Sequence, residues 1–264
     1  KTVSIEEANL EVVGTQKLGS KGTNEWLVSE HTSLPRRVTE LRASFGVSYN
    51  PGPSNTGIEF KSSDWIGNFQ YAVGITDRLM LSGLALAYRF GDAGHREWLV
   101  SAGVRNFGFG FSSVESFIVN GTLGVGVDMR QWLSPTTSLW AGVNAQSYGY
   151  FSGLRTRTFD NLTMGASLGV SHTFGEVVTV NLGASVDYTP ILGAGLVGYL
   201  DPPGSTGPTV VIGSALAPAG RALPLIQLHL SKHWSITGDV KLGFDLKNGK
   251  TWQSYTIGVL TTFP

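Results

Sequence analysis

The chain has 264 residues, with 19 Lys plus Arg balanced by 19 Asp plus Glu, 35 glycines and no cysteine. A zero net charge and a charged fraction of only 14% argue against a nucleic-acid surface, and the lack of cysteine excludes disulfides and thiolate metal sites. No run approaches the roughly 18 apolar residues that a membrane-spanning helix needs. A soluble β-sandwich would share much of this composition, so periodicity must decide the fold class.

Residues 1–37 have a higher density of charged residues than the remainder, including Glu6, Glu7, Lys17 and Arg37. We expect this stretch to lie outside any bilayer, as a periplasmic extension or a plug, and the alternative is a poorly ordered terminus. We expect Lys1 to follow the cleavage site of a removed signal peptide or a boundary set by cloning. Residues 38–264 form the second predicted unit.

From residue 38 onward, apolar and polar side chains alternate with period two, which is typical of β-strands with one apolar side. In the first strand Leu41, Ala43 and Phe45 share one face, and Arg42 and Ser44 share the other. The same pattern predicts strands at 41–49, 69–75, 84–90, 98–105, 107–119, 122–131, 139–146, 162–171, 178–188, 226–230, 235–246 and 252–263.

The stretch 107–131 has two interpretations. Asn120-Gly121 is a strong hairpin signal, which divides the stretch into strands 107–119 and 122–131. The alternative is one long strand. Because of this stretch and of residues 208–216, totals of 10 or 14 strands remain as alternatives to 12.

The strands are long, and their apolar faces are free of charge. The alternation continues for about 9–13 residues, enough to cross a membrane at a tilt, whereas strands of soluble domains average about 5–6. Except in 107–119, whose facing is unassigned, the apolar faces carry no Asp, Glu, Lys or Arg. The sequence therefore predicts lipid on one side of the strands and water or polar contacts on the other.

Connections of two kinds alternate along the chain. Short turns are predicted at 76–78, 174–176 and 231–233, and long loops at 50–65, 150–160 and 189–221. Short turns at one end and long loops at the other are typical of membrane barrels, with the short turns in the periplasm. We also expect aromatic girdles, with Trp132, Trp140 and Trp234 near short turns and Trp65, Trp98 and Trp252 near long loops.

The last strand, 252–263, places Tyr255, Ile257, Val259 and Phe263 on one face. It resembles the closing strand of bacterial outer-membrane β-barrels, which typically ends in an aromatic residue. The resemblance implies an all-β fold, a transmembrane antiparallel up-and-down barrel of about 12 strands, and a place in the bacterial outer membrane. Such a barrel would contact outer-membrane lipid and lipopolysaccharide.

Nothing in the sequence predicts an enzyme, a cofactor or a metal site. His95 is expected in an outer loop near Asp92, and no serine is spaced to pair with it. The match to GxGxxG at 193–198 is followed by Pro-Pro-Gly rather than by a helix, so it does not indicate a nucleotide site.

Charges on the predicted inward faces are the most informative candidates for function. Both signs occur there, which indicates a wet or ion-paired interior. The predicted lumen-lining residues are Arg42, Arg89, Arg105, Asp128, Arg130, Asp187, His229, Asp239 and Lys241. They favour a narrow, weakly selective channel for small solutes. The alternative is a non-conducting barrel that acts as a membrane anchor or as a subunit of a larger outer-membrane assembly.

The loop 189–221 is unusually long and apolar. We expect it to fold over or into the barrel mouth and constrict the pore through Leu192, Leu196, Tyr199 and Val211. A strand pair formed by residues 209–214, or contact with a partner, are the alternatives. A periplasmic or outer-membrane protein would bind through residues 1–37 or 189–221.

Overall fold

The computed structural model describes residues 32–51, 61–92, 95–112, 118–134, 136–152, 156–157, 162–175, 177–191, 208–213, 223–231, 233–246 and 249–263. These residues contain no helix that is long and apolar enough to cross a membrane. The described chain is all β. Its strands are β1 (Thr39–Pro51), β2 (Lys61–Gly74), β3 (Leu79–Ser82), β4 (Leu84–Asp92), β5 (Arg96–Ser112), β6 (Ile118–Ser134), β7 (Thr137–Ser152), β8 (Thr156–Arg157), β9 (Leu162–Phe174), β10 (Val178–Ile191), β11 (Pro208–Gly213), β12 (Ile226–His229), β13 (Trp234–Asp245) and β14 (Lys250–Phe263).

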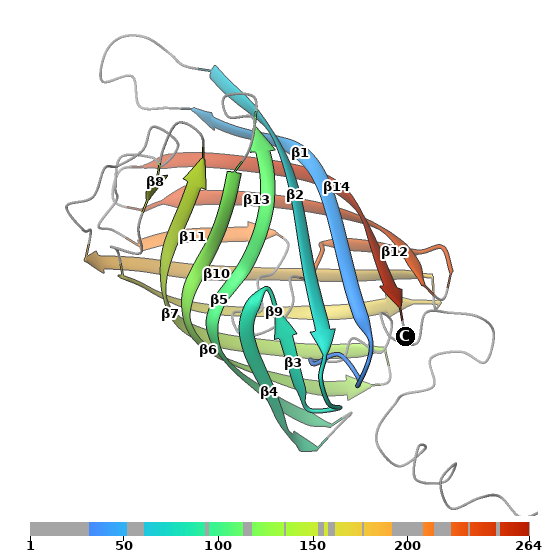
Figure 1. Ribbon diagram of the computed structural model, residues 1–264. Helices are drawn as coiled ribbons and strands as arrows, with labels where there is room; N and C mark the ends of the chain where they lie inside the picture. The colour runs from blue at the N-terminus through green and yellow to red at the C-terminus, as the bar shows by residue number, and fades with distance from the viewer. Residues whose placement is uncertain are drawn as a thin grey trace, which may run out of the picture.

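The strands form a closed antiparallel barrel of 12 strands, as predicted (Figure 1). Neighbours in sequence pair with each other, and β1 pairs with β14 to close the wall. β11 and β12 together fill one position, and β8 pairs only with the end of β7. We call the end with the turns β2–β3, β6–β7 and β9–β10 the short-turn end, and the other the long-loop end.

The hairpin β3–β4 is shorter than its neighbours and turns at Gly83, which has a φ of 60° that other residues rarely adopt. Above this turn β5 pairs directly with β2, after a register shift between Arg105 and Gly108. The bulge bends β5 away from β4 and toward β2. The wall thus has twelve strands at the short-turn end and, without β3 and β4, ten at the long-loop end.

One wall position is divided between two short strands. β11 pairs with β10 and β13 toward the long-loop end, from Tyr188↔Pro208 to Gly183↔Gly213. β12 continues between the same two strands toward the short-turn end. Residues 223–225 lead into β12 from the lumenal side, because Pro224 O and Leu225 N bond to the side chains of Asn181 and Asp239.

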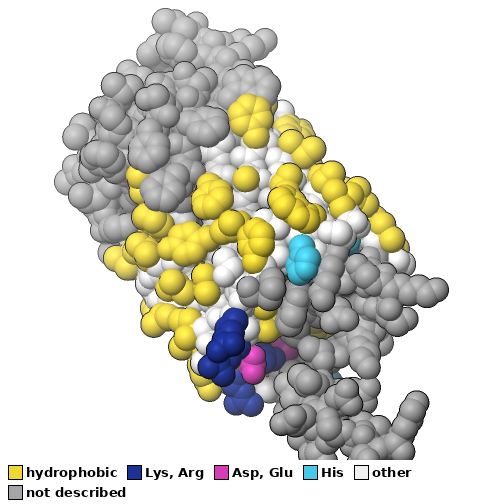
Figure 2. All heavy atoms as spheres, turned by 45° about the vertical axis from the view of Figure 1, so that its right-hand side comes forward, with side chains coloured by type: hydrophobic (Ala, Val, Ile, Leu, Met, Phe, Trp, Pro, Cys, Tyr) yellow, Lys and Arg dark blue, Asp and Glu magenta, His cyan; other side chains and the backbone are white. Residues whose placement is uncertain are grey.

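The outer surface is apolar. Large side chains such as Leu168, Leu182, Val143 and Ile257 are exposed to at least half of their area. Figure 2 shows hydrophobic side chains spread over the wall, while the charged side chains visible on that face gather at its lower end. So much exposed apolar surface is unfavourable in water and favourable in lipid. The wall is therefore built to cross a membrane.

The predicted total of 12 strands is confirmed, but the predicted assignment of residues 75–131 to individual strands is wrong in part. Asn120 and Gly121 lie inside β6, where pairing on both sides excludes a turn. Residues 107–112 continue β5, and the hairpin β3–β4 supplies the additional strand. Because β4 returns to the short-turn end, His95 lies there and not in an outer loop, with its carbonyl accepting a bond from Trp132 N.

The predicted tryptophan girdles are wrong for several positions. Trp132 and Trp140 are 9% and 5% exposed and face the lumen, and Trp252 also lies on the inner face. Trp98 stacks on Phe90 at the short-turn end, whereas Trp234 is exposed near a short turn as expected. Alternation along a strand decides whether a tryptophan side chain faces lipid or the lumen, whatever its distance from the end of the strand. Large rings that face inward help to fill the lumen.

Candidate functional site: the barrel lumen

The predicted lumen-lining residues all occupy inward positions on their strands. Six of them are at most 9% exposed: Arg42, Arg89, Arg105, Asp128, Arg130 and His229. Asp187, Asp239 and Lys241 are partly exposed. The pattern follows from strand geometry, since successive side chains of a strand point to opposite faces. Their role in conduction stays a prediction.

Inner side chains become more accessible toward the long-loop end. On β10, Thr179 and Asn181 are 0% and 1% exposed, whereas Ser185 is partly exposed. On β13, Thr237 is 0% exposed, whereas Lys241 is partly exposed. The short-turn part of these strands is therefore filled, and part of the inner surface toward the long-loop end is open to solvent, although Asp245 at the end of β13 is only 7% exposed.

Part of this filling comes from the chain that precedes β1. Residues 32–38, here called the plug segment, lie against the inner faces of β2 to β5. Leu34 is fully buried, and its apolar cluster contains Val38, Ala72, Met80, Ala87 and Leu99. Gly74 is required at the point of contact, because a Cβ there would lie 1.8 Å from Pro35 O. The extension predicted for residues 1–37 can be followed only from Thr32, since 1–31 lie outside the described residues.

Polar contacts hold the plug segment beside this cluster. Arg89 Nη1 donates to Glu97 Oε1 at 3.0 Å, and Thr32 Oγ1 donates to Glu97 Oε2 at 2.8 Å. Arg89 Nη2 also donates to Asp77 O at 3.0 Å, and Ser33 Oγ shares that carbonyl. Glu97 is only 2% exposed, so its charge depends on these donors for compensation.

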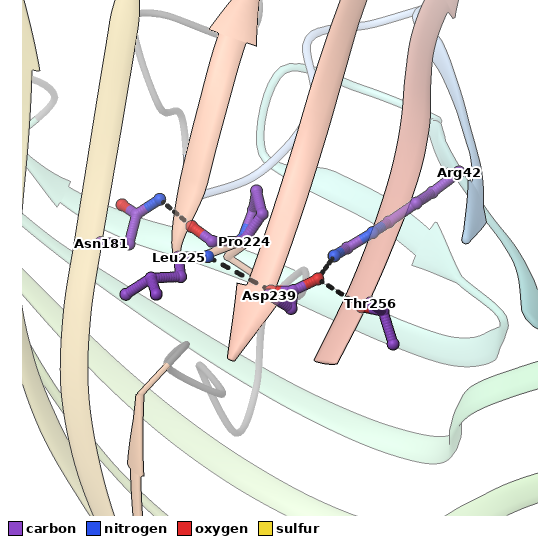
Figure 3. Close-up of polar contacts among 6 residues, drawn as sticks. All are labelled: Arg42, Asn181, Pro224, Leu225, Asp239 and Thr256. Carbon is purple, nitrogen blue, oxygen red and sulfur yellow. Dashed lines mark hydrogen bonds and ion pairs between the residues drawn. The ribbon is translucent and has the colours of Figure 1, made fainter. Parts of the chain in front are cut away.

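A second set of polar contacts lies along the inner face of neighbouring strands (Figure 3). Arg42 of β1 forms an ion pair with Asp239 of β13, and Thr256 Oγ1 donates to the same carboxylate oxygen. Leu225 N donates to the other oxygen at 3.2 Å, and Asn181 Nδ2 donates to Pro224 O at 2.7 Å. These contacts connect the consecutive wall strands from β1 through β14, β13 and β12 to β10 on their inner face.

Two further inner side chains, His229 and Arg130, have polar partners. His229 lies between two hydroxyls, with Nε2 at 2.9 Å from Thr179 Oγ1 and Nδ1 at 3.2 Å from Ser235 Oγ. Arg130 donates to Ser138 Oγ and lies 4.6 Å from the centre of the Trp132 ring. His229 and Arg130 are at most 8% exposed, so these residues pack the lumen. The described residues also contain no group of three His, Asp or Glu that would suit a metal ion.

The predicted loop constriction is only partly visible. Leu192, Leu196 and Tyr199 lie outside the described residues. Val211 lies on the inner side of β11, between Ser185 of β10 and Gly243 of β13, so residues 208–213 extend the wall. Constriction by this loop stays a prediction.

Sequence reasoning missed the plug residue Leu34 and its polar neighbour Glu97. Glu97 lies four and eight residues before Ser101 and Arg105, and therefore on the same side of the strand. Extending the alternation toward the start of the strand would have placed Glu97 in the lumen. Leu34 precedes the periodic region, and its burial depends on space inside a barrel that local sequence does not reveal.

Comparisons with known proteins find fold neighbours only. No family model matches this sequence, and neither does any curated protein. An outer membrane channel from Pseudomonas putida F1 is 12% identical, with a TM-score of 0.49 over 88% of this chain and 97% of that one. A FadL homologue from Pseudomonas aeruginosa is 10% identical, with a TM-score of 0.45 over 93% of this chain and 95% of that one.

The toluene transporter TodX from Pseudomonas putida is 9% identical, with a TM-score of 0.38 over 95% of this chain and 96% of that one. None of these likenesses assigns a solute to this chain. The closed wall, the apolar outer surface and the alternation of short and long connections identify the chain as a β-barrel of the bacterial outer-membrane type.

Proposed function

We propose that this chain forms a narrow, weakly selective channel for small solutes in the bacterial outer membrane, with its short-turn end in the periplasm. The observation that carries the proposal is the change in exposure along the lumen. A polar, charged inner face is partly accessible toward the long-loop end, and the plug segment helps to close the other half.

The plug segment is a suitable stopper, because it lies outside the paired wall strands and can leave the lumen without breaking the wall. The plug segment precedes β1, whose pairing with β2 and β14 begins at Thr39. Its contacts within the described residues are one apolar cluster and a few hydrogen bonds. We expect solutes to pass when the segment moves aside.

Single-channel recording in planar bilayers tests this function. The full chain should give small, infrequent openings, and a variant lacking residues 1–37 should give larger or more frequent ones. A monomeric porin in the same bilayers serves as the positive control. If both forms are silent while the control conducts, the channel proposal fails. Loss of a co-purifying envelope protein in the deletion would then favour the anchoring role.

A further inference from the structure

Lys241 is an inward-facing cation without an ionic partner among the described residues. It lies on β13 two positions after Asp239 and is partly exposed to the lumen. Its pairing neighbours are Gly213 on β11 and Ser254 on β14. In the described part of the chain no hydrogen bond or ion pair joins its ammonium to a protein acceptor.

The nearest carboxylate along β13 is already occupied. One oxygen of Asp239 accepts from Arg42 and from Thr256, and the other accepts from Leu225 N. Two cations thus share the region of one carboxylate whose oxygens are taken. Arg42 and Lys241 bring two positive charges beside the single negative charge of Asp239.

The surroundings of Lys241 offer hydrogen-bond donors. The inward neighbours Gly213 and Gly243 have no side chains, and the Trp252 indole occupies the position over Gly243. The Ser254 hydroxyl lies on the neighbouring strand. An ammonium, a hydroxyl and an indole N–H are donors that an oxyanion would satisfy.

The position along the lumen also favours recognition of a solute. Lys241 lies where the accessible half meets the filled half, so a solute entering from the long-loop end reaches it before the Arg42–Asp239 pair. Asp187 has the opposite sign and lies nearer the long-loop end on β10, at the height of Thr209. It shares the space over Gly165 with the Asn144 amide.

We propose, on the basis of the channel function above, that Lys241 with Arg42 forms an anion-recognition site inside the lumen. Its ligands are small oxyanions, namely inorganic phosphate and short carboxylates. Recognition by an unpaired lysine beside a filled region makes the channel prefer anions over cations.

A fluorescence experiment tests recognition without requiring conduction. The difference between the full chain and Trp252→Phe isolates the emission of the indole next to Lys241. Iodide should quench this component more strongly than caesium does, and Lys241→Glu should reduce iodide quenching severalfold while quenching by neutral acrylamide stays unchanged. Inorganic phosphate should protect the same component from iodide. Equal iodide quenching in the full chain and in Lys241→Glu would overturn the proposal.

Reversal potentials in a KCl gradient test the consequence for transport. Lys241→Arg should keep the chloride-to-potassium ratio within about twofold, since it retains the charge. Lys241→Glu should invert the preference, Asp187→Asn should increase it, and Leu133→Ala on the outer face of β6 is the neutral control. If the channel opens but its chloride-to-potassium ratio is the same in the full chain and in Lys241→Glu, anion recognition is refuted and the channel proposal stands. Silent bilayers with Lys241-dependent iodide quenching refute the channel and leave the site intact.

Discussion

Replacement of Leu34 by Ala should release the plug segment from the lumen. The Leu34 side chain is 0% exposed and packs in a cluster with residues of β2, β3, β4 and β5. Leu→Ala at such sites costs about 2–5 kcal/mol. Taking about 3 kcal/mol, and about 1.4 kcal/mol per factor of ten, the undocked population should rise roughly 100-fold.

The absence of native cysteine provides a direct assay. Ser33 is 2% exposed, so a single Ser33→Cys thiol should react slowly with a water-soluble maleimide while the segment is docked. When opening is fast relative to labelling, the labelling rate follows the undocked population. Leu34→Ala should therefore accelerate labelling of Ser33→Cys by about the same 100-fold factor.

The matched control is Leu133→Ala at the end of β6. Leu133 is 60% exposed, so the same chemical change occurs without contact to the plug segment. Labelling of Ser33→Cys should then stay unchanged. If Leu34→Ala lowers the stability of the whole barrel and labelling remains slow, the segment is an integral part of the fold and the reasoning fails.

Three further predictions concern the wall and the lumen. Leu182→Arg on the lipid face of β10 should lower the free energy of unfolding in vesicles by about 2–4 kcal/mol, whereas Ser185→Arg on its inner face should cost much less. Equal losses of stability in urea titrations would contradict the assignment of Leu182 to the lipid face and of Ser185 to the inner face. Gly169→Ala should destabilise by about 1–3 kcal/mol, because the new Cβ would lie 2.1 Å from the Trp140 ring, whereas Gly238→Ala, with nothing within 4 Å, should be neutral; near-UV circular dichroism and urea titration report both. Arg42→Ala should cost about 3–5 kcal/mol, because it removes the ionic partner of Asp239; a double-mutant cycle with Asp239→Ala that gives no coupling energy would show that the pair does not matter for stability.

The sequence alone determined which side of nearly every strand meets lipid. Strand alternation is a local property, so Leu182 and Asn181 had to face opposite ways in any sheet. Long apolar faces on every predicted strand then required a closed wall in lipid, because open sheet edges cannot be satisfied there. For the same reason the inward positions of Arg42, Asp239 and Lys241 were predictable.

Only the tertiary structure decided which strands pair and what fills the lumen. Asn120-Gly121 has the composition of a turn, but pairing of β6 with β5 and β7 keeps it extended. Residues 79–92 fold as a hairpin at Gly83 because β5 crosses to β2 above it. Burial of Leu34, and the inward rings of Trp132 and Trp140, depend on the space that the closed wall encloses. Such space is set by contacts between residues far apart in the chain, and no local pattern records it.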